Sequence, residues 1–126
     1  MKTIYSTDKA PAAIGPYSQA VEAGGFMFIS GQIPLVPGTG ELIKGGIREQ
    51  TKQVLDNIGA ILQAAGLDYR DVVKCTVFLA DIYQFKEMNE VYSGFFKTEQ
   101  PARAAFEVSR LPMNALIEID TIAFRS

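Results

Sequence analysis

The chain has 126 residues, of which 48% are hydrophobic, and it carries one cysteine, no histidine and a formal net charge of −2. The lack of histidine excludes Ser-His-Asp and Cys-His nucleophile systems and every His-ligated metal centre. An acidic chain without a basic run also argues against nucleic-acid binding. The composition predicts one domain, residues 1–126, with a hydrophobic core that needs no disulfide.

The sequence carries no signal for secretion or membrane insertion. Its N-terminus lacks the apolar stretch of a secretory signal, and no apolar run approaches the ~18 residues of a membrane span. The single thiol, Cys75, lies in an apolar segment and suits a reducing compartment. We therefore expect a cytoplasmic protein that does not contact a membrane.

The N-terminal third is predicted to form three short strands. They are residues 2–5, 18–22 and 26–30, the last two joined as a hairpin by the turn 23–25. The loop 8–17 holds two prolines and a glycine, which would interrupt a strand ladder. Gly31 follows the third strand directly, and a glycine there indicates a bulge or a close backbone approach.

The middle of the chain is predicted to run helix, strand, helix. The first helix, residues 48–65, has an apolar face at the 3.6-residue period, with Gly66 at the position that ends a helix. The strand 72–80 places Val73 and Cys75 on one face and Val72 on the other. A second helix begins at Asp81, which forms a capping-box pattern with Gln84. Its apolar stripe is Phe85, Met88, Tyr92, Phe95 and Phe96.

The C-terminal quarter, Pro101 to Ala123, is predicted to form two strands around a turn with Pro112 and Asn114. A simple hairpin that pairs Arg110 with Leu116 would put Glu118 opposite Val108, on the face away from Arg103. These two charged side chains would then converge only across a subunit boundary or after a bulge shifts the register.

The predicted order β, ββ, α, β, α, ββ gives an α+β fold in which two helices cover one face of a sheet. The strands nevertheless carry apolar residues on both faces, as in Cys75 and Phe78. The second face must also be shielded from water. We predict that other copies of the chain cover it in a closed homo-oligomer; the alternative is a cover of loops.

Arg103 and Glu118 are charges inside apolar, strand-forming segments, where burial is costly unless they are paired or bind a ligand. A guanidinium can grip a carboxylate with two hydrogen bonds; the alternative is a salt bridge from Arg103 to Glu107. An apolar site would raise the pKa of Glu118 and suit it to acid/base work; the alternative is a solvated carboxylate beside Asp120. Cys75 is interpreted as a core thiol.

Several separated motifs resemble the RidA (YjgF-type) family of reactive-intermediate deaminases. They are APAAIGPYSQAV at 10–21, ISGQIP at 29–34, DNIGAILQAAGL at 56–67, VVKCTVFLADI at 72–82, MNEVY at 88–92 and the C-terminal PARAAFEVSRLP with its I-E-I. The resemblance runs in order along essentially the whole chain. It implies a chorismate-mutase-like fold with a mixed six-stranded sheet, assembled as a homotrimer with ligand sites between subunits.

The implied activity is hydrolysis of 2-iminobutanoate, 2-iminopropanoate and their enamines to 2-oxo acids and ammonia, without a metal or organic cofactor. By resemblance Arg103 grips the substrate carboxylate and Glu118 positions or activates the attacking water. The cleft-lining positions are Tyr17, Ser30, Gly31, Asn89 and Ala105. The family's common Arg-Ser-Cys is Arg103-Ala104-Ala105 here, so no thiol role is expected, although the Ala105 backbone remains available to a ligand.

Two other functions remain open at this stage. The same cleft would also serve a regulatory module that binds a small carboxylate, such as a 2-oxo acid, without catalysis. A translation inhibitor or ribonuclease is the third hypothesis, and the acidic, histidine-free chain does not favour it. Taken alone, Tyr17, Ser30 and Asn89 are also typical local hydrogen-bonding residues.

Overall fold

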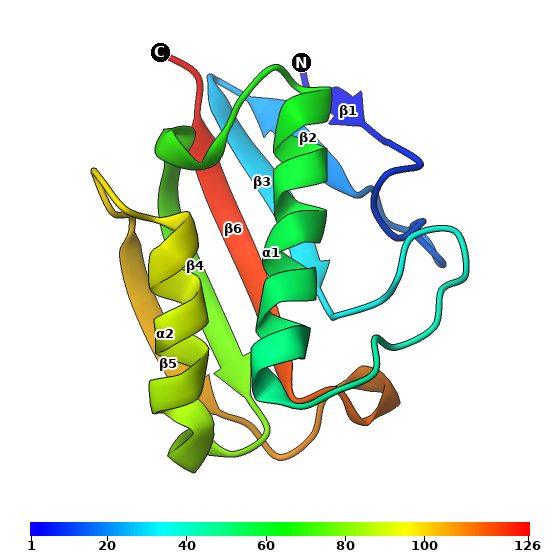
Figure 1. Ribbon diagram of the computed structural model, residues 1–126. Helices are drawn as coiled ribbons and strands as arrows, with labels where there is room; N and C mark the ends of the chain where they lie inside the picture. The colour runs from blue at the N-terminus through cyan, green and yellow to red at the C-terminus, as the bar shows by residue number, and fades with distance from the viewer.

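The structure is a computed structural model that describes all 126 residues. Its six strands form one mixed sheet in the order β1-β2-β3-β6-β4-β5. The strands are β1 (Thr3–Tyr5), β2 (Ala20–Ala23), β3 (Phe26–Gln32), β4 (Val72–Leu79), β5 (Ala102–Glu107) and β6 (Ile117–Phe124). Helices α1 (Ile47–Ala64) and α2 (Phe85–Phe95) lie side by side on one face (Figure 1). The predicted α+β class and the one-sided helix layer are confirmed.

The core fills the space between the helices and the sheet. Strand alternation sends Cys75, Val77 and Ile119 toward the helices, where all three are fully buried. The period of α1 turns Val54 and Ile58 to meet them. Gly66 ends α1 at φ +74, and Leu67 donates its backbone N–H back to Leu62, closing a Schellman turn. The helix-period prediction was therefore right to within one residue at each end.

The predicted C-terminal hairpin is wrong, because β4 lies between β5 and β6. Strand β4 pairs parallel with β5 and antiparallel with β6, so Arg103 lies opposite Cys75 and Glu118 lies opposite Phe78. A parallel pair requires a crossover, and α2 supplies it. The 3-10 turn Pro112–Asn114 then carries the chain past the end of β4 into β6.

Two local predictions also fail. A register shift between Val72 and Lys74 buries Val72 and leaves Val73 exposed, so their predicted faces are exchanged. Asp81 caps a 3-10 turn, Ile82–Gln84, by accepting the backbone N–H of Tyr83, and α2 begins only at Phe85. The reciprocal half of the predicted box is absent, and Gln84 Oε1 is buried without a partner.

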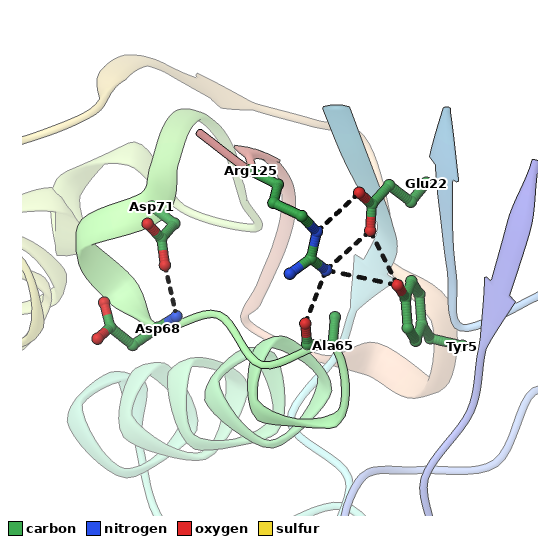
Figure 2. Close-up of polar contacts among 6 residues, drawn as sticks. All are labelled: Tyr5, Glu22, Ala65, Asp68, Asp71 and Arg125. Carbon is green, nitrogen blue, oxygen red and sulfur yellow. Dashed lines mark hydrogen bonds and ion pairs between the residues drawn. The ribbon is translucent and has the colours of Figure 1, made fainter. Parts of the chain in front are cut away.

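An arginine cluster joins the far edge of the sheet to the helix layer (Figure 2). The Arg125 guanidinium donates two hydrogen bonds of 2.9 Å to the Glu22 carboxylate and one of 2.7 Å to the carbonyl oxygen of Ala65. The Tyr5 hydroxyl donates to the same carboxylate at 2.9 Å. This cluster connects β1, β2, the end of α1 and the C-terminal segment.

The sheet face away from the helices has no cover within the chain. Phe26, Phe28 and Phe106 lie on it and are 44%, 48% and 53% exposed. These rings come from β3 and β5, on either side of the central strands. No helix of the structure has the length and apolar character needed to cross a membrane.

Candidate active site

Arg103 lies on the edge strand β5, on the face that carries the helices. Its guanidinium donates a 2.6 Å hydrogen bond to Asn89 Oδ1 on α2. The guanidinium carbon lies 4.7 Å from the centroid of the Tyr92 ring. The predicted alternative, a salt bridge to Glu107, does not form, because four residues of extended strand separate the two by roughly 13 Å. Glu107 accepts the backbone N–H of Ile82 at 3.0 Å. Arg103 is exposed and has no carboxylate partner.

A cavity of about 370 Å³ lies beside this guanidinium. Its lining joins the last turns of α2 to the start of β5 and consists of Asn89, Tyr92, Ser93, Phe96, Gln100, Pro101 and Arg103. Ala105 is two residues beyond Arg103 on the same face of β5. Because β5 is an edge strand, the backbone groups along its outer edge pair with no other strand. The corner thus combines an unpaired cation, amide groups and free backbone, which suits a small carboxylate.

Glu118 lies on the central strand β6, on the open face of the sheet. It is half-buried, and burial raises the pKa of its carboxyl group above the usual value, with a smaller contribution from Asp120. This is the direction expected of a carboxylate in an apolar site. A central strand also removes the alternative of an edge carboxylate surrounded by water.

Gly31 provides the space that the Glu118 carboxylate occupies. The register between β3 and β6 shifts between Ile29 and Gln32, as the glycine predicted. A Cβ atom at position 31 would overlap Glu118 Oε2 and lie 3.0 Å from its Cδ. No other residue type can stand there without displacing the carboxylate.

Tyr17 and Gly31 line a second cavity, of about 250 Å³, together with the loop that precedes β6. Gln19 holds Tyr17's loop in place: its buried side-chain amide accepts the Thr7 backbone N–H at 2.7 Å and donates to the Pro11 carbonyl at 2.7 Å. The Ser30 hydroxyl donates a 2.6 Å hydrogen bond to the Ser18 carbonyl oxygen. A local hydrogen bond of this type is the role that the sequence offered for Ser30 as the alternative to ligand binding.

The seven predicted residues therefore form two groups rather than one site. Arg103, Asn89 and Ala105 lie on or against the helix-bearing face of β5. Glu118, Gly31, Tyr17 and Ser30 lie at the junction of β3, β6 and the 8–17 loop. The prediction that Arg103 and Glu118 face opposite sides is confirmed, although the strand pairing behind it was wrong.

Two aromatic residues beside Arg103 were not predicted as site residues. Phe85 and Tyr92 were assigned only to the apolar stripe of α2, yet both rings face the guanidinium. Their spacing from Asn89, four residues on one side and three on the other, places all three on one helix face and could have revealed them. No three His, Cys, Asp or Glu side chains lie close enough to hold a metal ion.

Comparison with known proteins identifies the family. The family model described as Endoribonuclease L-PSP matches residues 7–125. A human protein named 2-iminobutanoate/2-iminopropanoate deaminase is 50% identical over 99% of this chain and 91% of its own length. The chain belongs to the RidA family. That prediction is confirmed, and the activity predicted with it is the one in the human protein's name.

Other RidA relatives agree along the whole chain. A RutC family protein of Pyrococcus horikoshii is 57% identical over 99% of both chains. A crystal structure of a Thermotoga maritima protein, described as a putative endoribonuclease, superimposes with a TM-score of 0.97 at 53% identity and covers 100% of this chain and 99% of its own. E. coli TdcF with bound serine has a TM-score of 0.93 at 44% identity, over 98% and 99% of the two chains.

Proposed function

We propose that this chain hydrolyses 2-imino acids and their enamine tautomers, such as 2-iminobutanoate and 2-iminopropanoate, to 2-oxo acids and ammonia. The observation that carries the proposal is the Arg103 guanidinium, which is held beside a cavity without any carboxylate to neutralise it. Relatives with this activity in their names match nearly the whole chain at about half identity. A reducing cytoplasm suits its single buried thiol.

The proposed reaction needs little beyond binding and one proton acceptor. Arg103 binds the substrate carboxylate through two parallel hydrogen bonds and fixes the position of C2. Water adds to C2 of the protonated imine, the C=N π pair moves to nitrogen, and the Glu118 carboxylate takes the proton that water loses. That proton passes to nitrogen, and an oxygen lone pair forms the C=O group as the C–N bond breaks. The hydroxyl proton leaves through the Glu118 carboxylate to the departing ammonia, so the nitrogen is released as ammonium.

Arg103 and Glu118 lie on opposite faces of one sheet, so a single chain does not supply both to one substrate. We propose that a homotrimer brings the Arg103 corner of one copy to the Glu118 corner of its neighbour. The exposed phenylalanines of the open face support this, because a face of that kind requires a cover. The assembly is tested by the solution mass of the native protein.

Mixing two impaired variants tests the shared site. In an assay coupled to a dehydratase that releases 2-iminobutanoate, Arg103→Ala should abolish imine hydrolysis and Glu118→Gln should leave only a small residual activity. In a cyclic trimer, every mixed assembly contains one site with both native side chains, so equal co-assembly should restore about a quarter of wild-type activity. No recovery would show that one chain supplies both groups, and full activity of Arg103→Ala would reject the function.

The competing functions give different results in the same assays. A regulatory module would bind 2-oxobutanoate at Arg103 without accelerating imine loss. A ribonuclease would cleave RNA in a manner lost in Arg103→Ala. The description of the matching family model names an endoribonuclease, but this chain is acidic, lacks histidine and has no basic stripe for a phosphate backbone.

A further inference from the structure

The Arg103 guanidinium is held by two aromatic rings and one amide. Its central carbon lies 4.7 Å from the centroid of the Tyr92 ring and 5.3 Å from that of the Phe85 ring, and Asn89 accepts its 2.6 Å hydrogen bond. A guanidinium within ~6 Å of a ring centroid is attracted by the ring's negative face. These partners restrain the side chain and leave its full positive charge in place.

The two rings are themselves fixed by the fold. Phe85, Asn89 and Tyr92 lie on one face of α2, directed toward β5. Tyr92 is buried and packs against Phe96 in a tilted arrangement with ring centroids 4.6 Å apart, and Phe85 packs half-buried against the core. A ring held by the core cannot turn away from the guanidinium without losing that packing.

We propose that Tyr92 and Phe85 are positioning residues for substrate binding: their rings hold the Arg103 guanidinium in the orientation that accepts the substrate carboxylate. The inference rests on the proposed function and adds how the arginine is presented. An acidic partner would also orient Arg103, but it would compete with the substrate for the same hydrogen bonds. Aromatic faces avoid that competition.

The Tyr92 hydroxyl does not take part in this role. Its oxygen is buried and makes no hydrogen bond of good geometry, although it lies near Cys75 and Arg103, and burial raises the pKa of Tyr92 far above its usual value, so the hydroxyl stays protonated. The ring face alone supports Arg103. Tyr92→Phe should therefore behave like the native protein, while Tyr92→Leu should not.

The test compares four variants by imine hydrolysis and by equilibrium binding of 2-oxobutanoate. Tyr92→Leu should raise KM and the Kd of 2-oxobutanoate about tenfold, and Phe85→Leu about threefold, with kcat within twofold. Tyr92→Phe should change neither constant more than twofold. Phe95→Leu is the matched control, because this ring lies on the same helix but packs on Tyr69, with centroids 5.4 Å apart, and not on Arg103.

The outcomes separate this inference from the proposed function. Equal increases of KM in Tyr92→Leu and Phe95→Leu would assign the effect to general packing and overturn the inference. Loss of activity in Arg103→Ala with unchanged KM in Tyr92→Leu and Phe85→Leu would overturn it while leaving the function intact. If Tyr92→Leu does not fold, the half-buried Phe85 gives the same decision, because unchanged KM in Phe85→Leu rejects the inference.

Discussion

Two arginines, one on the edge strand β5 and one directly after the central strand β6, show two uses of the same side chain. Arg125 is bound by a carboxylate, a tyrosine hydroxyl and a backbone carbonyl, so Nε and Nη2 of its guanidinium both have partners within the fold. Arg103 has an amide and two ring faces and no anion. The first arrangement secures the C-terminus, and the second leaves a charge for a ligand.

The carboxylates of Glu22 and Glu118 differ in the same way as the two arginines. The bond from Arg125, and then that from Tyr5, holds the pKa of Glu22 below its usual range. Glu118 has no cation, and burial raises its pKa. A raised pKa brings a carboxylate closer to the range in which it can exchange protons during a reaction. The cluster of Arg125 and Glu22 is therefore structural, and the residues without an ion-pair partner, Arg103 and Glu118, are the candidates for chemistry.

Among the residues that have no ion-pair partner within the chain, Glu118 should show the largest effect on activity after Arg103. In Glu118→Gln the side-chain amide cannot accept a proton from water. The kcat/KM for 2-iminobutanoate should fall by about 10²–10⁴. In the native enzyme kcat/KM should decrease as the pH falls, with a midpoint above the ~4.3 of an ordinary glutamate. This acidic limb should be absent from the residual activity of the variant. Asp120→Asn, on the same strand face, is the control and should retain the limb, shifted slightly downward.

Gly31→Ala should have the next largest effect, because the new methyl group displaces the Glu118 carboxylate. A displacement of about 1 Å can cost roughly 100-fold in rate, so kcat should fall by up to that factor. Gly94→Ala on α2 is the matched control, since a Cβ there meets no atom within 4 Å. Equal activity of the two variants would show that the position of Glu118 does not control the rate.

Arg125→Leu should lower stability and leave the chemistry unchanged, the reverse of Arg103→Ala. It leaves the Glu22 carboxylate and the Ala65 carbonyl without their partner, so the thermal midpoint should fall by roughly 5 °C. Arg48→Leu, which loses only an exposed ion pair with Glu90, should fall by about 1 °C or less. An imine-hydrolysis defect in Arg125→Leu at 25 °C would break the comparison.

Local sequence patterns predicted the helices and strands themselves better than they predicted which of these elements lie next to one another in space. The periodicity of residues 48–65 determined α1 because each apolar residue reports only its own helix face. The order of β4, β5 and β6 depends on a crossover between distant segments, and the two C-terminal runs alone favoured a hairpin. The bulge at Val72 likewise leaves no mark in a run of apolar residues.

The site residues were predicted from the family resemblance, but their arrangement was not. Strand alternation separated Arg103 from Glu118, and motif positions alone cannot say which groups share a cavity. Phe85 and Tyr92 were missed because an aromatic stripe on a helix usually packs in a core, and Tyr92 does that as well. Only the position of β5 beneath α2 reveals the second role of these rings.

The smallest expected effect concerns stability rather than rate. Glu22 and Glu118 should contribute in opposite directions to the pH dependence of the free energy of unfolding. The folded-state pKa of Glu22 is lowered, so its contribution to stability is present above its unfolded pKa of ~4.3 and is lost as the pH falls through the folded value. The folded-state pKa of Glu118 is raised, so its contribution is present at low pH and is lost as the pH rises through the folded value. The test is the free energy of unfolding, measured by urea denaturation from pH 3 to 7. At acid pH it should fall less steeply in Arg125→Leu than in the native protein. Above pH 4 it should decline less steeply in Glu118→Gln than in the native protein. Identical slopes in all three proteins would mean that neither carboxylate changes its proton affinity on folding, and the contrast between the two carboxylates would then rest on geometry alone.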